Sequence, residues 1–318
     1  MTAFLAGRTG AVGKVPWRAE YLPVPTNAAS FEAFDAWLTE ATEWAAVGAG
    51  PGWPQAFTGG AMHGFIYRSP SDPADATLCG ALAPSRDSAG RLFPLALAAP
   101  LRMSPELLRR PELLPFTLEG LWAEATAALA DLLLEPPTDA GPALTAGQEA
   151  EVAESAGLYD EWVATLPLAE LWALLGPAMV DPGATLQMLF ETLAPTRGVE
   201  RPTTTLSLRL PLGLAGGAAL CFWLDVVRRC AGWQSTLPSL FWSHDGSTGA
   251  ALLSLGRPSK GALAELWMPS GKRDDAADLT KPADPAWAAA FSPLPPAVSA
   301  ALSSPQATVA HLLSAIDA

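Results

Sequence analysis

The side chains best suited to specific chemistry lie in one short polar segment of an otherwise apolar chain. Residues 84–94 read PSRDSAGRLFP and join two segments that are expected to be β-strands. Ser85 and Asp87 can accept hydrogen bonds from neighbouring backbone amides, and Gly90 can adopt a positive φ. The planar guanidinium of Arg91 has five donors, which can clamp Asp87 or reach a carboxylate of a partner protein. The segment therefore predicts a rigid structural loop or a recognition loop, and both roles can hold together.

A glycine-rich segment near the start, residues 7–14 (GRTGAVGK), invites comparison with a phosphate-binding loop. Such a loop requires Gly, four residues, and then Gly-Lys-Ser/Thr. Counting back from Gly13, Arg8 occupies the position of the first glycine. Val15 stands where a hydroxyl would hold magnesium. We therefore expect no bound nucleotide and no cofactor.

The histidines give little support for catalysis or metal binding. His63, His244 and His311 are widely separated, and none has metal-ligand spacing to another histidine or to a cysteine. No Gly-x-Ser-x-Gly elbow supports a serine hydrolase. The sequence therefore predicts a protein with no catalytic residues and no metal site. The alternative is an orphan hydrolase or ligand-binding enzyme with a pocket between two domains.

The composition limits the classes of partner. The chain has 318 residues, of which half are apolar, so it can form a sizeable core and is long enough for two domains. Lys and Arg total 19 against 32 Asp and Glu, which gives a net charge of −13. A surface this acidic repels phosphate backbones and anionic lipids. Nucleic acid is therefore not expected as a partner.

The longest apolar run, residues 211–224 (PLGLAGGAALCFWL), ends before Asp225. A membrane-spanning helix needs about 20 apolar residues, so this run predicts a buried segment rather than an anchor. The N-terminus lacks a cationic start followed by an apolar stretch, so no secretory signal is expected. Cys79, Cys221 and Cys230 show no paired spacing and are expected to be small buried residues. Together these features predict no membrane insertion and a cytoplasmic location.

A proline- and glycine-rich segment divides the expected elements into two groups. Residues 135–148 (EPPTDAGPALTAGQ) lack periodicity and form the expected linker. They would separate an N-terminal domain, residues 1–134, from a C-terminal domain, residues 149–318. In the first, Ser30 is the expected N-cap of a helix that ends near Ala45. The other elements expected there are strands at 63–69, 77–83 and 92–98 and helices beginning at 104 and spanning 117–134.

The second group also mixes helices and strands. Its expected elements are helices at 148–157, 167–175, 184–193 and 220–229 and strands at 203–210, 238–243 and 250–255. His244, Asp245 and Gly246 form the expected turn between the last two strands. Ser304 and Pro305 are expected to begin a final helix. Strands that follow one another along the chain favour antiparallel pairing. The predicted class is therefore α+β, with an antiparallel-rich sheet flanked by helices and a second α+β segment.

The polar segment resembles the signature of a known family. Type VI secretion system-associated proteins called TagF or ImpM carry Ser-x-Asp-x-x-Gly-Arg-x-Phe/Tyr-Pro after a strand. The matching residues in this sequence are Ser85, Asp87, Gly90, Arg91, Phe93 and Pro94. The family also carries Gly-Lys-x-Pro near its start and a helix with a Trp-Leu step, which are matched here by Gly13, Lys14, Pro16, Trp37 and Leu38. These matches follow the family order through the first third of the chain, and residues 239–242 (SLFW) resemble a segment of longer members.

The resemblance implies a cytoplasmic accessory protein that acts after translation as a negative regulator of a type VI secretion system. Its partner would be a forkhead-associated (FHA) scaffold protein, alongside a Ser/Thr kinase and phosphatase. The N-terminal domain would resemble a longin/SNARE-like module, and no catalytic residues are implied. Lys14, Asp87 and Arg91 would then shape or form the binding surface.

One position departs from the family pattern. After Gly-Lys-x-Pro the family usually reads Gly-Asp-Phe, whereas this chain has Ala19, Glu20 and Tyr21. Glu20 keeps an acid and Tyr21 an aromatic ring, while the backbone freedom of the glycine is lost.

Overall fold

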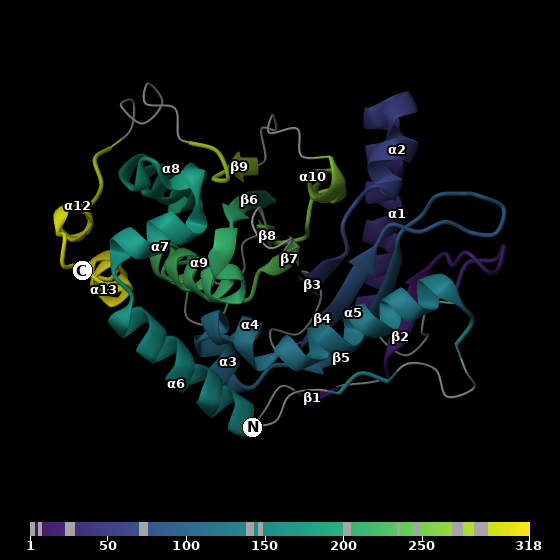
Figure 1. The fold of residues 1–318 in the computed structure, drawn as a ribbon, viewed down its shortest axis with the longest axis horizontal. Helices are drawn as coiled ribbons and strands as arrows, with labels where there is room; N and C mark the ends of the chain where they lie inside the picture. Colours follow the sequence, from purple (N-terminus) through teal and green to yellow (C-terminus); the bar gives the residue numbers. More distant parts are fainter. Residues whose placement is uncertain are drawn as a thin grey trace.

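The computed structural model describes residues 4–5, 8–22, 29–69, 76–137, 143–145, 149–199, 205–233, 236–243, 249–268, 276–282 and 292–318. Its centre is one sheet of nine strands with the order β1-β5-β4-β3-β7-β8-β6-β9, in which β2 also pairs with β5. Helices cover both faces of this sheet (Figure 1). The expected α+β class is therefore confirmed.

The first five strands come from the beginning of the chain. They are β1 (Phe4–Leu5), β2 (Gly10–Gly13), β3 (His63–Tyr67), β4 (Ala76–Ala83) and β5 (Leu95–Arg102). All their pairings are antiparallel. The strand expected at 92–98 begins only at Leu95, because Leu92 pairs with Arg86 within the preceding loop. The loop is thus closed before the strand begins.

The remaining four strands follow the expected linker. They are β6 (Leu206–Pro211), β7 (Ser239–Ser243), β8 (Ala250–Leu255) and β9 (Ala276–Asp278). β7, β8 and β6 pair in antiparallel fashion, and only β9 lies parallel to its neighbour β6. The hairpin strands expected at 238–243 and 250–255 are confirmed. The turn expected at His244, Asp245 and Gly246 lies outside the described residues.

The two groups of strands share one sheet. β3 pairs with β7, which brings Gly64 opposite Trp242 and Phe65 opposite Phe241. The sheet therefore continues from the segment before residues 135–148 to the segment after them. The division into domains at 1–134 and 149–318 stays a prediction, as does the longin-like comparison.

Alternation along the strands separates two apolar cores. On one face, α1 (Ala29–Ala49), α2 (Trp53–Thr58) and α10 (Ala262–Trp267) pack on side chains such as Phe65 and Leu82. α1 begins at Ala29, slightly before the expected cap Ser30. Its buried residues recur every three or four positions, which is the pattern of a helix with one apolar face.

The other face carries the larger core. There, α5 (Glu119–Leu134) covers β4 and β5, and α9 (Gly216–Ala231) covers the strands of the second group. The remaining helices are α3 (Pro105–Arg109), α4 (Leu114–Thr117), α6 (Glu149–Thr165), α7 (Leu168–Leu175), α8 (Pro182–Leu193), α12 (Pro296–Ser303) and α13 (Val309–Ile316). Several of these pack around α9 (Figure 1). α13 begins at Val309 rather than at Ser304 because Thr308 and His311 form a capping box at that point.

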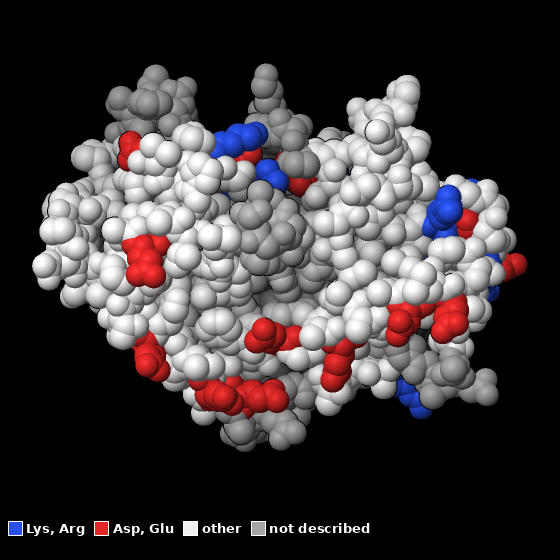
Figure 2. Space-filling view, in the orientation of Figure 1, with Lys and Arg blue, Asp and Glu red and all other residues white. Residues whose placement is uncertain are grey.

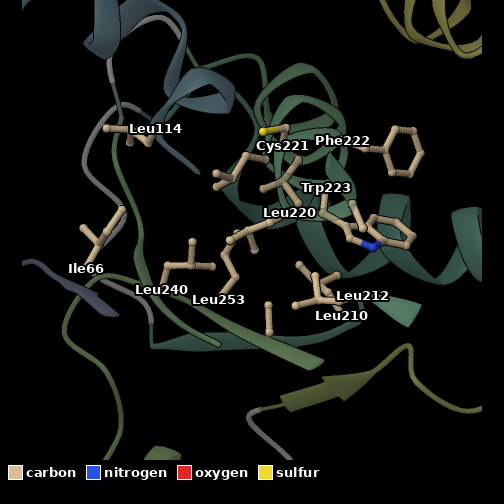
Figure 3. Packing of buried hydrophobic residues seen from close by; sticks show 14 of the residues in the cluster. Ile66, Leu114, Leu210, Leu212, Leu220, Cys221, Phe222, Trp223, Leu240 and Leu253 are labelled. Atoms are coloured by element: carbon tan, nitrogen blue, oxygen red, sulfur yellow. The ribbon is translucent and has the colours of Figure 1, made fainter. Parts of the chain in front are cut away.

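α9 accounts for the apolar run at 211–224. Figure 3 shows Leu220 facing Leu240 and Leu253, with Trp223 beside Leu210. The indole of Trp223 donates a hydrogen bond of 2.7 Å to the carbonyl oxygen of Pro211. Within the described part of the chain, no helix is both long enough and apolar enough to span a membrane.

Candidate functional site

Two loops bring most of the residues predicted for the site together. The Asp87 loop, residues 84–94, connects β4 to β5, and the Lys14 loop, residues 14–22, follows β2. β2 and β4 both pair with β5, so the two loops leave the sheet beside each other. The backbone amide of Ser88 donates to the carbonyl oxygen of Arg18 at 3.0 Å and links them directly.

The Asp87 carboxylate is the centre of the site. Its side chain is fully buried, and its Oδ1 accepts hydrogen bonds from the backbone amides of Ala89 (3.0 Å) and Arg91 (2.8 Å). Oδ2 accepts from Nε of Arg91 at 2.6 Å and pairs with Nζ of Lys14 at 3.0 Å. Both carboxylate oxygens are therefore occupied by donors from this chain.

These contacts control the protonation of the acid. Burial by itself raises the pKa of Asp87, but hydrogen bonds from the backbone of Arg91 and from the Lys14 and Arg91 side chains outweigh it. The result is a pKa well below the usual range for an aspartate. Asp87 is therefore an ionised anchor and is unsuited to act as a general acid or base near neutral pH.

Arg91 is both an anchor and a surface group. Its Nη2 donates to the carbonyl oxygen of Ala19 at 2.7 Å, so its guanidinium fastens the Lys14 loop as well as Asp87. The side chain is still 62% exposed. Within the described part of the chain, Nη1 of Arg91 has no hydrogen-bond partner, which leaves one edge of the fork available to another molecule.

Small and rigid residues shape the backbone around this clamp. The hydroxyl of Ser85 donates to the carbonyl oxygen of Lys14 at 2.7 Å. Gly90 has φ +82°, in the region that favours glycine. Gly13 has φ +121°, and a Cβ there would lie 2.0 Å from the carbonyl oxygen of Pro94. The glycines at positions 13 and 90 are thus explained by backbone conformation and, at Gly13, by close approach of the Pro94 backbone.

The Lys14 loop is fixed at two further points. Pro16 lies in its turn, and the neighbouring Trp17 donates its indole hydrogen to the carbonyl oxygen of Leu132 in α5 at 2.9 Å. Tyr21 packs edge-on against Phe93 with ring centroids 5.3 Å apart, and its hydroxyl donates to Asp35 of α1. Tyr21 therefore supplies an aromatic contact at the position where the sequence departs from Gly-Asp-Phe.

Trp37 is the one predicted site residue that lies in the core instead. It is fully buried in α1 and packs against Phe241 of β7 with ring centroids 5.2 Å apart. Its indole donates to the carbonyl oxygen of Ser259 at 3.1 Å. Trp37 thus joins the first α-helix to the second half of the chain.

A second polar cluster, which was not predicted from the sequence, is buried beside α9. Asp225 is 1% exposed and accepts hydrogen bonds from Arg228 (2.6 Å), Arg229 (2.7 Å) and the hydroxyl of Tyr159 (3.0 Å). Arg228 also pairs with the buried Glu112 at 3.3 Å. Burial, followed by the nearby Asp225, raises the pKa of Glu112. The available signal was Asp225 itself, an acid that follows an apolar run and precedes two arginines at helical spacing.

Other reactive groups are held in the interior. Cys79, Cys221 and Cys230 are buried and free, and burial raises the pKa of the Cys230 thiol to about 12. Burial also lowers the pKa of His63 to about 4, and its Nδ1 lies 3.0 Å from the carbonyl oxygen of Ala61. The described residues include no group of three or more His, Cys, Asp or Glu side chains arranged to hold a metal ion.

The chain was compared with curated proteins and with solved structures. No curated protein matches the chain. Among solved structures, the crystal structure of PA0076 from Pseudomonas aeruginosa PAO1 is similar, with 18% sequence identity and a TM-score of 0.44 over 83% of this chain and 96% of that one.

The family comparison is more specific and covers both loops. Residues 10–142 match the family described as TagF N-terminal domain, type VI secretion system-associated. The matched range includes Lys14, Asp87 and Arg91, whose side chains form the clamp. Residues 10–142 of this chain are therefore similar to the N-terminal domain of the type VI secretion system-associated TagF proteins.

Proposed function

We propose that this chain is a non-catalytic, cytoplasmic negative regulator of a type VI secretion system. In this proposal it binds an FHA scaffold protein through the joined surface of the Lys14 loop and the Asp87 loop. The family match supports an accessory role in secretion. Repression and the scaffold partner are the parts of the proposal that the binding and secretion experiments below test.

One observation carries the choice of surface. The buried Asp87 fixes the guanidinium of Arg91 in place, although 62% of the arginine side chain is exposed. A charged group that is immobilised before binding loses less conformational entropy when a partner carboxylate arrives. The same clamp fixes Lys14, so two loops are presented as one rigid unit.

The test compares two arginines of the same loop. A tagged wild-type protein should recover the FHA scaffold from the native bacterium, and purified components should give a dissociation constant. Arg91→Ala should weaken scaffold binding by at least about tenfold, which corresponds to about 1.4 kcal/mol. Arg86→Ala is the matched control because Arg86 is exposed and its side chain makes no hydrogen bond or ion pair within the described residues.

Folding must be measured on the same samples. Circular dichroism and a melting curve would show whether the Arg91→Ala variant keeps its structure. Equal binding by a folded Arg91→Ala variant and the wild type would refute the contact role. Deletion of this protein from the native bacterium tests whether it represses or activates secretion, because loss of a repressor should increase secretion.

A further inference from the structure

Two adjoining hollows lie along α5, apart from the loops that form the clamp. The first, of about 780 Å³, lies between α5, the start of α9 and the strands β3 and β7. The second, of about 550 Å³, lies between the start of α5 and α6. They share Phe116 and Glu119, and we name them together the α5 groove.

The floor of the α5 groove is apolar and closely fitted. Trp122 and Trp242 meet edge to face with ring centroids 4.2 Å apart. Gly64 lies under the second ring, where a Cβ would come within 2.4 Å of Trp242. Beyond Glu119 and Trp122, the side chains that α5 presents to the first hollow are small and include the exposed Ala123 and Ala127. Such a face allows another helix to approach closely.

The rim of the groove is acidic. Glu119, Glu151 and Glu154 line the second hollow, and neither hollow has a lysine or arginine among its described lining residues. Figure 2 shows acidic side chains spread along the lower half of this face, where Figure 1 places α5 and α6. Glu119 and Glu154 are exposed and have no ion-pair partner in the described ranges. The rim therefore attracts cations.

Two further side chains of the second hollow are a buried, unpaired hydroxyl and an exposed apolar group. Thr117 lines the second hollow and is 4% exposed, yet its hydroxyl has no hydrogen-bond partner among the described residues. Buried polar groups in folded proteins normally have hydrogen-bond partners. Leu158 lines the same hollow and leaves 54% of its surface exposed.

We propose that the α5 groove docks a cationic amphipathic helix supplied by a different protein. Its apolar side chains would cover Trp122, Trp242 and Leu158, and its Lys or Arg side chains would pair with Glu119 and Glu154. This is the mode in which an amphipathic helix lies in an apolar groove. The acidic rim disfavours nucleic acid and anionic lipid.

A second copy of this chain does not offer such a helix. Among the described helices of twelve or more residues, only α9 contains lysine or arginine. Both of its arginines, Arg228 and Arg229, are engaged with the buried Asp225. The long helices that the structure describes therefore do not supply the occupant, and the proposal assigns it to another protein. The proposal goes beyond the regulatory function above, because the groove and the loops share no residue.

The first experiment selects helical peptides from a phage-displayed library against the purified full chain. Ala127→Arg, which fills the first hollow, serves for counter-selection, and Ala36→Arg on the exposed side of α1 is the matched control. Selected peptides should have apolar residues spaced i, i+3, i+4 and i+7 and Lys or Arg on the remaining face. Enrichment of acidic or uncharged peptides, or no enrichment beyond that on Ala127→Arg, would overturn the proposal.

The second experiment measures the affinity of the best fluorescein-labelled peptide by anisotropy. Glu119→Gln/Glu154→Gln should weaken binding by tenfold or more, whereas Glu32→Gln/Glu43→Gln, which changes the net charge equally on α1, should alter it less than twofold. If both double variants weakened binding equally, the effect would come from net charge alone, and the α5 groove would be refuted as the docking site. Light scattering that shows a dimer dissociated by Ala127→Arg would identify a second copy as the occupant and also refute it. Neither readout depends on secretion.

Discussion

At the scale of single residues, the clamp shows how one buried acid organises two loops. Asp87 receives two backbone hydrogen bonds and two cationic side chains, and Arg91 extends the connection to the carbonyl oxygen of Ala19. Charge-assisted hydrogen bonds of this kind are stronger than neutral ones. Removing the charge therefore affects the position of both loops, whereas removing an exposed cation affects only the surface.

Replacement of Asp87 by Asn tests that difference. The amide keeps the shape of the side chain but loses the charge that holds Lys14 and Arg91. We expect the melting temperature at pH 7 to fall by several degrees. The control is Glu20→Gln, because Glu20 is 73% exposed and pairs with Arg18 at 3.5 Å, and it should leave the melting temperature almost unchanged. Equal melting temperatures for both variants would contradict the anchoring role.

The depressed pKa of Asp87 also predicts a pH dependence. An aspartate has a pKa of about 3.9 when unfolded, and that of Asp87 in the fold lies well below this value. Its contribution to stability is therefore complete above about pH 4 and is lost progressively as the pH falls toward the folded pKa. We expect the difference in melting temperature between wild type and Asp87→Asn to shrink between pH 5 and pH 2. A constant difference over that range would contradict this linkage.

At the scale of elements, local patterns predicted more than long-range contacts did. The strands β3, β4, β7 and β8 could be predicted because turn residues bound short runs of β-forming side chains. The pairing of β3 with β7 could not, because it joins segments that no local signal connects. Trp37 was visible as part of a motif, but its burial against Phe241 depends on that same pairing.

The polar clusters also show that local sequence patterns predict more than long-range contacts do. Ser85, Asp87, Gly90 and Arg91 lie in one loop, so their spacing along the sequence reflects their spacing in space. The buried cluster around Asp225 draws on residues from α6, α9 and the segment before α4, and sequence order hides that proximity. Burial of Asp225 depends on which face of α9 packs against the core. The residues before Asp225 are apolar on every face of the helix, so the sequence pattern does not show which face that is.

Glycine positions at the ends of elements give a sharper test of local geometry. Gly13 and Gly90 both have positive φ, but only Gly13 also lies against the backbone of Pro94. We expect Gly90→Ala to cost about 1–2 kcal/mol from the backbone conformation alone. Gly13→Ala should cost about 3 kcal/mol or more, because the carbonyl oxygen of Pro94 must also move. Urea unfolding of both variants would measure this, and equal costs would show that the contact relaxes without strain.

At the scale of the whole molecule, two of the features that connect the segments on either side of residues 135–148 are strand pairing and ion pairs. One is the sheet, through β3 and β7. The other is a chain of ion pairs in which Arg110 contacts Asp160 at 2.7 Å and Glu112 contacts Arg228 at 3.3 Å. The two arginines beside Asp225 neutralise an acid that the core would not otherwise accept. The network therefore ties α6 and α9 to the end of the first segment.

The last prediction separates the buried part of this network from its exposed end. Asp225 and Asp317 both pair with Arg229, but Asp225 is 1% exposed while the side chain of Asp317 is 52% exposed. Asp225→Asn removes the buried acid that Arg228 and Arg229 share and should lower the free energy of unfolding by about 3–5 kcal/mol. Asp317→Asn should cost less than about 1 kcal/mol. Urea denaturation followed by tryptophan fluorescence would measure both, and a cooperative transition would show that the two segments unfold together. A small effect of Asp225→Asn, equal to that of Asp317→Asn, would mean that the apolar contacts around α9 hold the two segments together without the ion pairs.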